Sequence, residues 1–349
     1  MLFWLGDHLK AHFGPARLLT SHLLLGGLGA ALCFTVTFVV LPRLMHRASV
    51  DRGKEHAVDG EASRGKPTGT GVIFIPVFVL MQFLCLPLTW QTTAVLLLVL
   101  GAMVFGYLDD RAALPWSEYK KGLFDLVLAA GGAAALSGFH ANKMWLPFYK
   151  GQIDLPAWAF IVGGTALIWL AINAMNCTDG VDSLSATLSL IAFSALGSLL
   201  YLVLGNERVA RYLLVPTAPN GAVWAMLAFS MSGTLLAYLW YNAPPSVLLM
   251  GDAGSRAIGF LLGVIVISTG NPFVLLIVSG VLLVNGGTGL VKVALLRFGR
   301  IRIFKNVRFP LHDHVRHRRD WSNAQVLVRF AAVQLILTSV LLLSLLKIR

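Results

Sequence analysis

Charge is scarce in this chain. Only 13% of its 349 residues are Asp, Glu, Lys or Arg, whereas 57% are hydrophobic, and the mean hydropathy is +0.75. A soluble domain averages about 25% charged residues, so this composition excludes an ordinary soluble protein. Cysteine is scarce too: the three cysteines lie in or near apolar runs and form no CxxC pair, which argues against a disulfide framework and a cysteine zinc site. Repeats and low-complexity tracts are lacking, so we expect one domain over residues 1–349.

Apolar runs of about 17–25 residues, the length that crosses a bilayer as a helix, recur along the chain. The eighth run is short, and the "NGGTG" stretch (285–289) in the ninth predicts a kink. We expect an all-α integral membrane protein with about ten transmembrane helices, preceded by a short amphipathic stretch on the membrane surface. The ten runs lie at about 22–41, 71–88, 92–108, 122–138, 156–172, 183–204, 222–240, 256–269, 272–295 and 324–347.

The distribution of basic residues predicts the orientation of these helices. With ten crossings both termini lie on one side, and the loops after the odd-numbered spans carry 18 of the 28 lysines and arginines. Because an excess of positive charge marks cytoplasmic loops, we expect a multi-pass membrane protein with both termini outside. The net charge of +12 is better explained by this topology and by anionic head groups or an anionic substrate than by nucleic acid.

Acidic residues gather in the same odd-numbered loops, which hold twelve of the sixteen Asp and Glu. The rule for positive charge does not require this placement, since acids contribute little to topology. The clustering of carboxylates with basic residues predicts a polar reaction site at the cytoplasmic face.

Two of these loops carry acids directly at the end of an apolar run. In "YLDDR" Asp109 and Asp110 are adjacent, and a pair this close favours a divalent cation or one retained proton; a charged helix cap is the structural alternative. In "MGDAGSRAIGF" (250–260) glycines flank Asp252 before a new helix. Backbone N–H groups at such a point can approach an anion, and Asp252 can hold a metal that neutralises a phosphate, although a plain turn has the same sequence.

The loop "NAMNCTDGVDS" (173–183) has polar residues at every third position, namely Asn173, Asn176, Asp179 and Asp182. Amides and carboxylates that share one broad face suit a sugar, a nucleobase or a metal. An N-cap explains one of these residues but not all four.

Two further loops carry basic residues, and one of them also carries histidines. "FPLHDHVRHRRDW" (309–321) places His312, Asp313 and His314 among arginines. Zinc is one option there, but without cysteines we favour recognition of phosphate and base. "SRGKPTGTGVIF" (63–74) resembles a phosphate-handling loop, in which Lys66 or Arg64 would reach a diphosphate, and a flexible lead-in to the helix is the alternative.

Taken in order, the four motifs resemble those of the polyprenyl-phosphate N-acetylhexosamine-1-phosphate transferases. Within that superfamily the chain is most similar to the phospho-N-acetylmuramoyl-pentapeptide transferases, and the resemblance extends over nearly the whole chain. Its most specific part is "FKNVRFPLHDH" followed by "WSNAQVLVRF".

This resemblance implies ten transmembrane helices, a cytoplasmic active site and Mg²⁺ as cofactor. The implied reaction transfers phospho-MurNAc-pentapeptide from its UDP conjugate to undecaprenyl phosphate in the bilayer, and family members often pair as homodimers. The matching catalytic positions here are Asp109, Asp110, Asp179, Asp252, His312 and His314, with Asp252 as the metal ligand. The matching substrate-binding positions are Lys121, Asn176, Asp182 and Asn242, of which Asp182 and Asn242 fall where the family contacts uridine. We expect Lys66, Thr68 and Asp313 to bind substrate as well.

The chain also departs from the family's pattern. Ala113 stands where a lysine is common, the usual triple histidine reads His312-Asp313-His314, and Arg316 replaces an acid. Because the acidic pair, Asp179 and Asp252 are intact, we expect the chemistry to be retained and donor recognition to be the part that changes.

Two other functions remain open at this point. A sister enzyme would use UDP-GlcNAc, and the altered histidine motif leaves room for it. A secondary transporter would place its charges near the bilayer midplane on broken helices, whereas here Asp125 is the only acid well inside a run. The acids at helix ends therefore favour an enzyme.

Overall fold

The computed structural model describes residues 1–347 except 52, 54–62, 113, 115, 141 and 219. Each of the ten apolar runs coincides with a helix, so the all-α prediction is confirmed. Among the described residues, eight helical segments are long and apolar enough to cross a membrane. The other two are α3, which has 15 residues, and α5, which is charged near its start.

The helices that match the runs follow one another along the chain. They are α2 (His22–Leu44), α3 (Gly71–Cys85), α4 (Trp90–Arg111), α5 (Glu118–Ser137), α6 (Ala157–Thr178), α7 (Leu184–Ser198) with the π-helical η4 (Leu199–Leu204), α9 (Gly221–Asn242), α10 (Gly251–Ser268), α11 (Val274–Leu282) with the π-helical η5 (Leu283–Gly287) and α12 (Thr288–Phe298), and α14 (Asn323–Lys347). Shorter elements connect them: α1 (Leu2–Leu9), η1 (Gly14–Thr20), η2 (Met45–Arg47), α8 (Glu207–Tyr212), α13 (Leu311–Arg319), and the antiparallel pairs β1 (Ser49–Val50) with β2 (Pro67–Thr68) and β3 (Asn142–Met144) with β4 (Ile153–Leu155).

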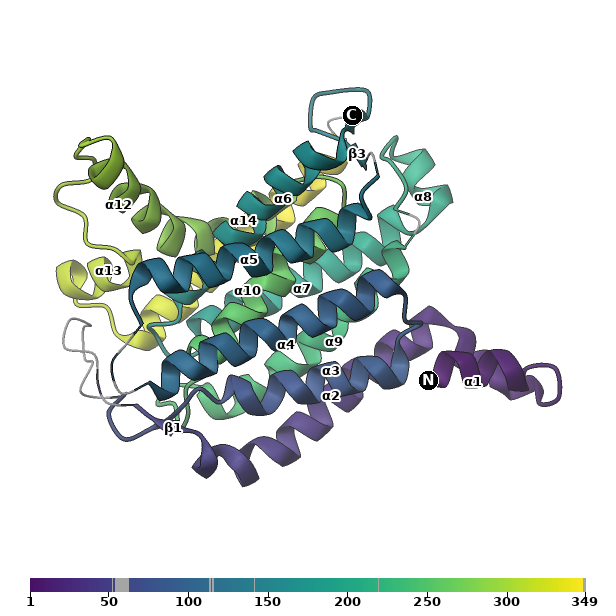
Figure 1. Ribbon diagram of the computed structural model, residues 1–349, viewed down its shortest axis with the longest axis horizontal. Helices are drawn as coiled ribbons and strands as arrows, with labels where there is room; N and C mark the ends of the chain where they lie inside the picture. Colours follow the sequence, from purple (N-terminus) through teal and green to yellow (C-terminus); the bar gives the residue numbers. More distant parts are fainter. Residues whose placement is uncertain are drawn as a thin grey trace.

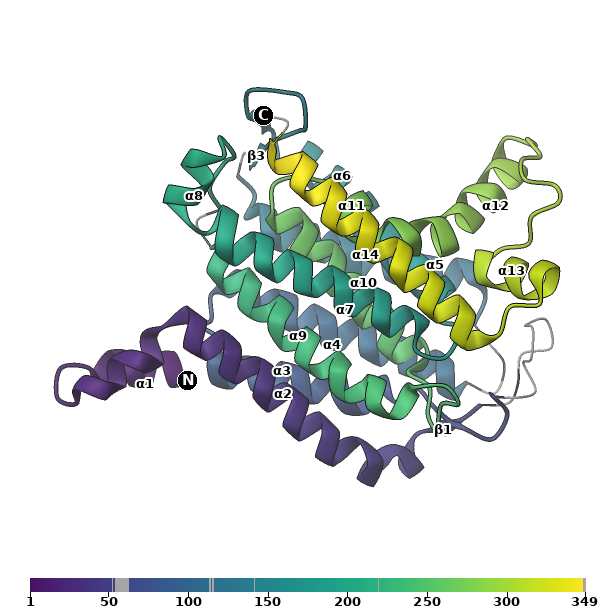
Figure 2. The ribbon, with the colours of Figure 1, turned by 180° about the vertical axis from the view of Figure 1, so that it is seen from behind.

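The long helices form one bundle with α10 in its middle. Figures 1 and 2 show α10 enclosed by its neighbours, and it contacts α3, α4, α5, α6, α7 and α9. Both chain termini lie at the end of the bundle opposite to β1 and α13. This placement agrees with an even number of crossings.

Small residues allow the bundle to close tightly around the first turn of α10. A Cβ added at Gly106 of α4 would lie 2.2 Å from the carbonyl oxygen of Asp252, and one added at Gly71 of α3 would lie 2.2 Å from the backbone nitrogen of Gly254. Glycine at both contacts lets the helix backbones approach directly, as is common between helices in membranes. The acidic end of α4 is thereby fixed against the start of α10.

The predicted kink in the ninth run is present. Ser279 has non-helical backbone angles (φ −135°, ψ 22°), and the π-helical η5 follows over the "NGG" residues. Beyond this point α12 has no buried residue and projects from the bundle (Figures 1 and 2). Two consecutive backbone irregularities therefore redirect the chain before it reaches α13.

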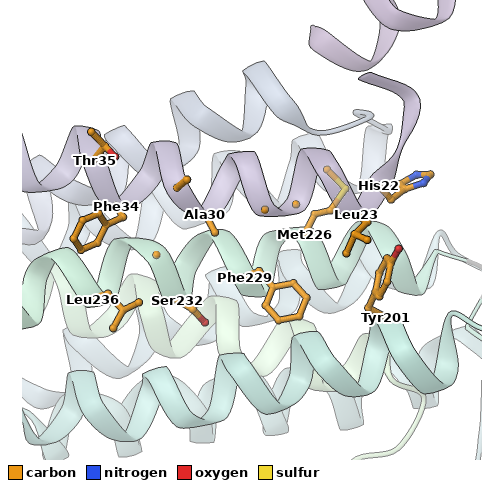
Figure 3. A pocket seen from close by; sticks show the side chains of 14 residues that line it. His22, Leu23, Ala30, Phe34, Thr35, Tyr201, Met226, Phe229, Ser232 and Leu236 are labelled. Carbon is orange, nitrogen blue, oxygen red and sulfur yellow. The ribbon is translucent and has the colours of Figure 1, made fainter. Parts of the chain in front are cut away.

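An apolar cavity of about 470 Å³ lies between α2, α9 and the π-helical η4. Figure 3 shows His22 and Tyr201 at one end of it and Phe34 and Leu236 toward the other. The lining offers no Asp, Glu, Lys or Arg. Phosphate chemistry therefore requires a different part of the molecule.

Candidate active site

The two adjacent acids at the end of α4 have different partners. Asp110 turns both carboxylate oxygens toward the start of α10, where they accept backbone N–H groups of Asp252 and Ala253, each at 3.0 Å. Gly251 precedes them with φ +65°, a conformation that favours glycine. Asp110 thus caps α10 from another helix and fixes the position of Asp252.

Asp109 belongs instead to an ionic cluster. Its Oδ1 accepts the backbone N–H of Trp116 at 2.8 Å, and its Oδ2 lies 2.7 Å from Nζ of Lys121 on α5. Lys121 Nζ also lies 3.8 Å from Oδ2 of Asp252. The structure therefore joins the first and third motifs through one lysine, as expected if all three side chains serve one site.

A buried arginine completes this cluster. Arg256, one helical turn after Asp252 on α10, donates to Asp252 Oδ2 from Nε at 3.2 Å and from Nη2 at 3.0 Å. Its Nη1 pairs with the carboxylate of Asp125 on α5. The side chains of Arg256 and Asp125 are only 5% and 1% exposed. A line of alternating charges, Asp109, Lys121, Asp252, Arg256 and Asp125, thus extends from the bundle end into its interior.

Asn176 connects the second motif to the same helix. Its Nδ2 donates to Ser255 Oγ at 3.0 Å, and Ser255 Oγ donates to the carbonyl oxygen of Gly251 at 3.0 Å. Because the serine has only one hydroxyl proton, it must accept from Asn176, which assigns the orientation of the amide. The Asn176 carbonyl oxygen is then the end directed away from Ser255.

The acids of the second motif lie at the turn between α6 and α7. Asp179 Oδ1 accepts the hydroxyl of Ser185 at 2.6 Å. Asp182 accepts both the backbone N–H of Ser246 at 3.1 Å and its hydroxyl at 2.7 Å. Lys66 Nζ donates to the same Ser246 Oγ at 3.1 Å. The structure therefore brings Lys66 and Asp182, two residues expected to bind the donor, to one serine.

Asn242 is buried beneath this group. Its Oδ1 accepts the backbone N–H of Ser183 at 2.7 Å, and its Nδ2 donates to the carbonyl oxygen of Leu248 at 2.8 Å. The amide thus holds the two loops that carry Asp182 and Ser246, and its expected contact with uridine stays a prediction. Thr68 lies in β2, paired with Ser49, and no described contact brings it to the ionic cluster.

The histidine motif meets the second motif through His312. This buried residue donates its backbone N–H to Oδ1 of Asn285 in η5 at 2.8 Å. A Cβ added at Gly180 would lie 2.6 Å from His312 Nε2, so the imidazole packs directly on the Asp179-Gly180 turn. Asn285 of the irregular η5 segment therefore positions His312 beside Asp179.

The two neighbours of His312 are placed differently. Asp313 is buried, with Oδ1 3.7 Å from His312 Nε2 and 3.6 Å from Nη1 of Arg316. His314 is half-buried, and its Nδ1 accepts the backbone N–H of Arg308 at 3.3 Å. The replacement of an acid by Arg316 thus supplies a cation next to Asp313. Ala113, the other departure of note, lies outside the described residues.

The oxygen donors at this end of the bundle fit Mg²⁺. Among the described residues no three His, Cys, Asp or Glu side chains gather in the way a closed metal cage requires. Mg²⁺ does not need such a cage, because it is usually held by one or two carboxylates and by substrate phosphates, with several waters retained. The carboxylate of Asp252, 19% exposed at the bundle end, and the amide oxygen of Asn176 are donors of the hard type that this ion prefers.

From the sequence alone, four residues are not assigned to the site: Asp125, Ser246, Arg256 and Asn285. Arg256 follows Asp252 by four positions, the spacing that pairs opposite charges on a helix. Asp125 is an acid within an apolar run, which needs a buried cation nearby. Together these two signals could have identified the pair. Ser246 and Asn285 carry no such signal, because their roles depend on which loops meet.

The cap made by Asp110 gives a prediction about stability. Replacing Asp110 with alanine leaves two amide N–H groups at the start of α10 without their acceptor, and we expect the free energy of unfolding to fall by about 2 kcal/mol. Thermal unfolding in detergent measures the effect. The control is Glu207→Ala, since Glu207 is exposed and, among the described residues, pairs only with Arg211 of the same helix α8. The melting temperature of this control should not change. An Asp110→Ala protein as stable as the parent would contradict the cap.

Comparison with known proteins gives one family. Residues 92–270 match a family model described as "Glycosyl transferase family 4", a stretch that holds the first three motifs. The chain is 48% identical over 346 residues, 98% of its own length and 95% of the relative's, to the phospho-N-acetylmuramoyl-pentapeptide-transferase of Treponema pallidum (strain Nichols), and equally to that of a second strain of this organism. It is 27% identical over 370 residues, covering all of both chains, to the protein of the same name from Aliarcobacter butzleri (strain RM4018).

Proposed function

Because the chain belongs to the family of phospho-N-acetylmuramoyl-pentapeptide transferases, we propose that it transfers phospho-MurNAc-pentapeptide from UDP-MurNAc-pentapeptide to undecaprenyl phosphate. The products are lipid I and UMP, and the reaction is the first membrane step of peptidoglycan synthesis. The observation that supports this proposal most directly is the ionic cluster of Asp109, Lys121, Asp252 and Arg256 at one end of the bundle. A soluble donor and a lipid acceptor can meet only at such an interface.

The reaction exchanges one phosphoanhydride for another, so it needs no separate energy source. Its barrier lies in bringing an anionic phosphate up to an anionic diphosphate. Lys121 and Arg256 offset that repulsion with fixed positive charge that is already in place before the substrates arrive. Asp252 would hold Mg²⁺, which when bound neutralises the diphosphate and stabilises the departing UMP.

The acceptor phosphate must lose its last proton before it attacks. We propose that the carboxylate of Asp109, which the Trp116 N–H and Lys121 Nζ hold in place, accepts that proton. Direct attack by the lipid phosphate is the route we favour. A covalent aspartyl-phosphate on Asp179 or Asp109 is the alternative route, and it uses the same acids.

The donor would lie across the second and fourth motifs. Asp182 and Lys66 meet at Ser246, and His312 packs on the turn after Asp179. These groups offer hydrogen bonds to a nucleoside and positive charge to a diphosphate. By the distribution of basic loops, the site faces the cytoplasm and the protein resides in the bacterial cytoplasmic membrane.

A comparison of donors tests the proposal. The purified protein is given undecaprenyl phosphate and Mg²⁺, and UMP release is measured with UDP-MurNAc-pentapeptide and with UDP-GlcNAc, each with and without EDTA. We expect metal-dependent release with the muramyl donor alone. Release with UDP-GlcNAc alone would assign the chain to the sister enzymes, and the altered His312-Asp313-His314 sequence would be the place to look for the change. A folded sample that is silent with both donors would favour a transporter.

A further inference from the structure

A second cavity, which is polar, lies beside Asp110. It has a volume of about 420 Å³ and opens between the C-terminal ends of α2 and α4 and the strand β1, elements that converge at one end of the bundle (Figure 1). None of the acids, amides or histidines of the candidate active site lines it except Asp110. The lining residues are Arg47, Ala48, Ser49, Val50, Tyr107, Asp110 and Arg111.

The charge of this cavity is positive. The guanidinium groups of Arg47 and Arg111 are exposed, and within the part of the chain that the structure describes neither forms an ion pair. The carboxylate of Asp110 offsets only one of them, and both of its oxygens face N–H groups at the positive end of α10. Two planar guanidinium groups beside a tyrosine hydroxyl suit the oxygens of a phosphate group.

The position of the cavity indicates where its ligand comes from. Arg47 is the last residue of the candidate span His22–Arg47, and Arg111 is the last residue of the candidate span Trp90–Arg111. Arginines at the ends of spanning helices reach the level of the lipid head groups. The span that ends at Arg47 is also among the least buried by the rest of the protein, so this side of the cavity adjoins the bilayer. A ligand anchored in the membrane can reach it laterally.

We propose that the Arg47–Arg111 cavity binds the phosphate group of a membrane lipid. The two arginines hold the phosphate oxygens, the Tyr107 hydroxyl donates to a third, and Ala48, Val50 and the tyrosine ring contact the carbons next to the phosphate. The lipid is either an anionic phospholipid or the polyprenyl phosphate acceptor, which share this chemistry. The second source rests on the proposed function, and the first does not.

Binding measured without any donor tests the proposal. Wild-type protein, Arg47→Gln/Arg111→Gln and the matched control Arg43→Gln/Arg302→Gln are titrated with dioleoylphosphatidylglycerol and, separately, with undecaprenyl phosphate. Bound lipid is counted by native mass spectrometry. Arg43 lies in the last turn of α2, four residues before Arg47, and neither control arginine lines the cavity. For the double variant we expect a loss of affinity of about tenfold for each arginine removed, and for the control no loss.

Each outcome has a defined meaning. A loss confined to undecaprenyl phosphate supports the proposal and identifies the acceptor, and a rise in KM for the acceptor should accompany it. A loss confined to phosphatidylglycerol supports the proposal and identifies a bulk lipid. The proposal is overturned if the folded double variant binds both lipids as the wild type does, or if the control loses as much. A wild type that binds lipid but releases no UMP with either donor would contradict the proposed function and not the cavity.

Discussion

Asp252→Asn should lower kcat for UMP release by about three orders of magnitude. Asp252 is the carboxylate that faces both Lys121 and Arg256, and it is the residue we propose to hold Mg²⁺. An amide of the same shape removes the negative charge that attracts the ion, and the loss of one charge-stabilising group at a reacting phosphate or oxyanion costs about 10²–10³ in rate. Turnover at saturating donor and acceptor measures this effect directly.

The same substitution should leave the fold intact. Arg256 keeps its pairing with Asp125 and can still donate to the amide oxygen at position 252, so the melting temperature should change little. Binding of Mn²⁺, followed by electron paramagnetic resonance without substrate, should weaken in parallel with kcat. The control is Asp154→Asn on β4, at the opposite end of the bundle, which should retain full activity. Near-normal turnover by a folded Asp252→Asn enzyme would remove Asp252 from the mechanism.

The second large effect concerns stability. Asp125→Leu leaves Arg256 without its most deeply buried partner, and uncompensated buried charge costs about 3–5 kcal/mol. We therefore expect a marked fall in the unfolding temperature in detergent. Asp125→Leu/Arg256→Met removes both charges and replaces them with apolar side chains of similar reach. Its stability should return to within about 1–2 kcal/mol of the wild type.

The two variants together separate charge from packing. If a poor fit of the larger leucine at position 125 caused the damage, the double variant would be at least as unstable as the single one. Recovery in the double variant identifies the unpaired guanidinium as the cause. Activity should not recover, because Arg256 also positions Asp252. A double variant with wild-type kcat would show that Asp252 does not need Arg256.

Much of this architecture is predictable from the sequence because it depends on local patterns. The ten helices follow from apolar runs of membrane-spanning length, and the kink follows from "NGGTG". The start of α10 was expected near residue 256, whereas the helix begins at Gly251. The physical reason is the cap: Asp110, more than a hundred residues earlier, satisfies the N–H groups of the first turn. No local pattern around Gly251 contains that information.

The different partners of Asp109 and Asp110 also depend on contacts between helices that are distant in the sequence. In the sequence they are one acidic pair, with a helix cap and a reaction site as competing interpretations. In the structure the two residues have different partners: Asp110 caps α10, and Asp109 joins Lys121 in the ionic cluster. A part in the reaction stays a prediction for both. The angle between successive side chains on α4 separates them, and only the packing of α4 against α10 and α5 determines which acid meets which partner.

The cap has a consequence for how the protein is made. Of the eight candidate spans, α10 has the lowest mean hydropathy, 1.4, and it carries Asp252 and Arg256, which are costly to place in hydrocarbon. Its two carboxylate partners, Asp110 and Asp125, are synthesised earlier, on α4 and α5. During translation we therefore expect α4 and α5 to be in the membrane before α10, so that Asp110 and Asp125 can contact the polar residues of α10 as it inserts. The order in which the helices are synthesised then lowers the cost of inserting α10.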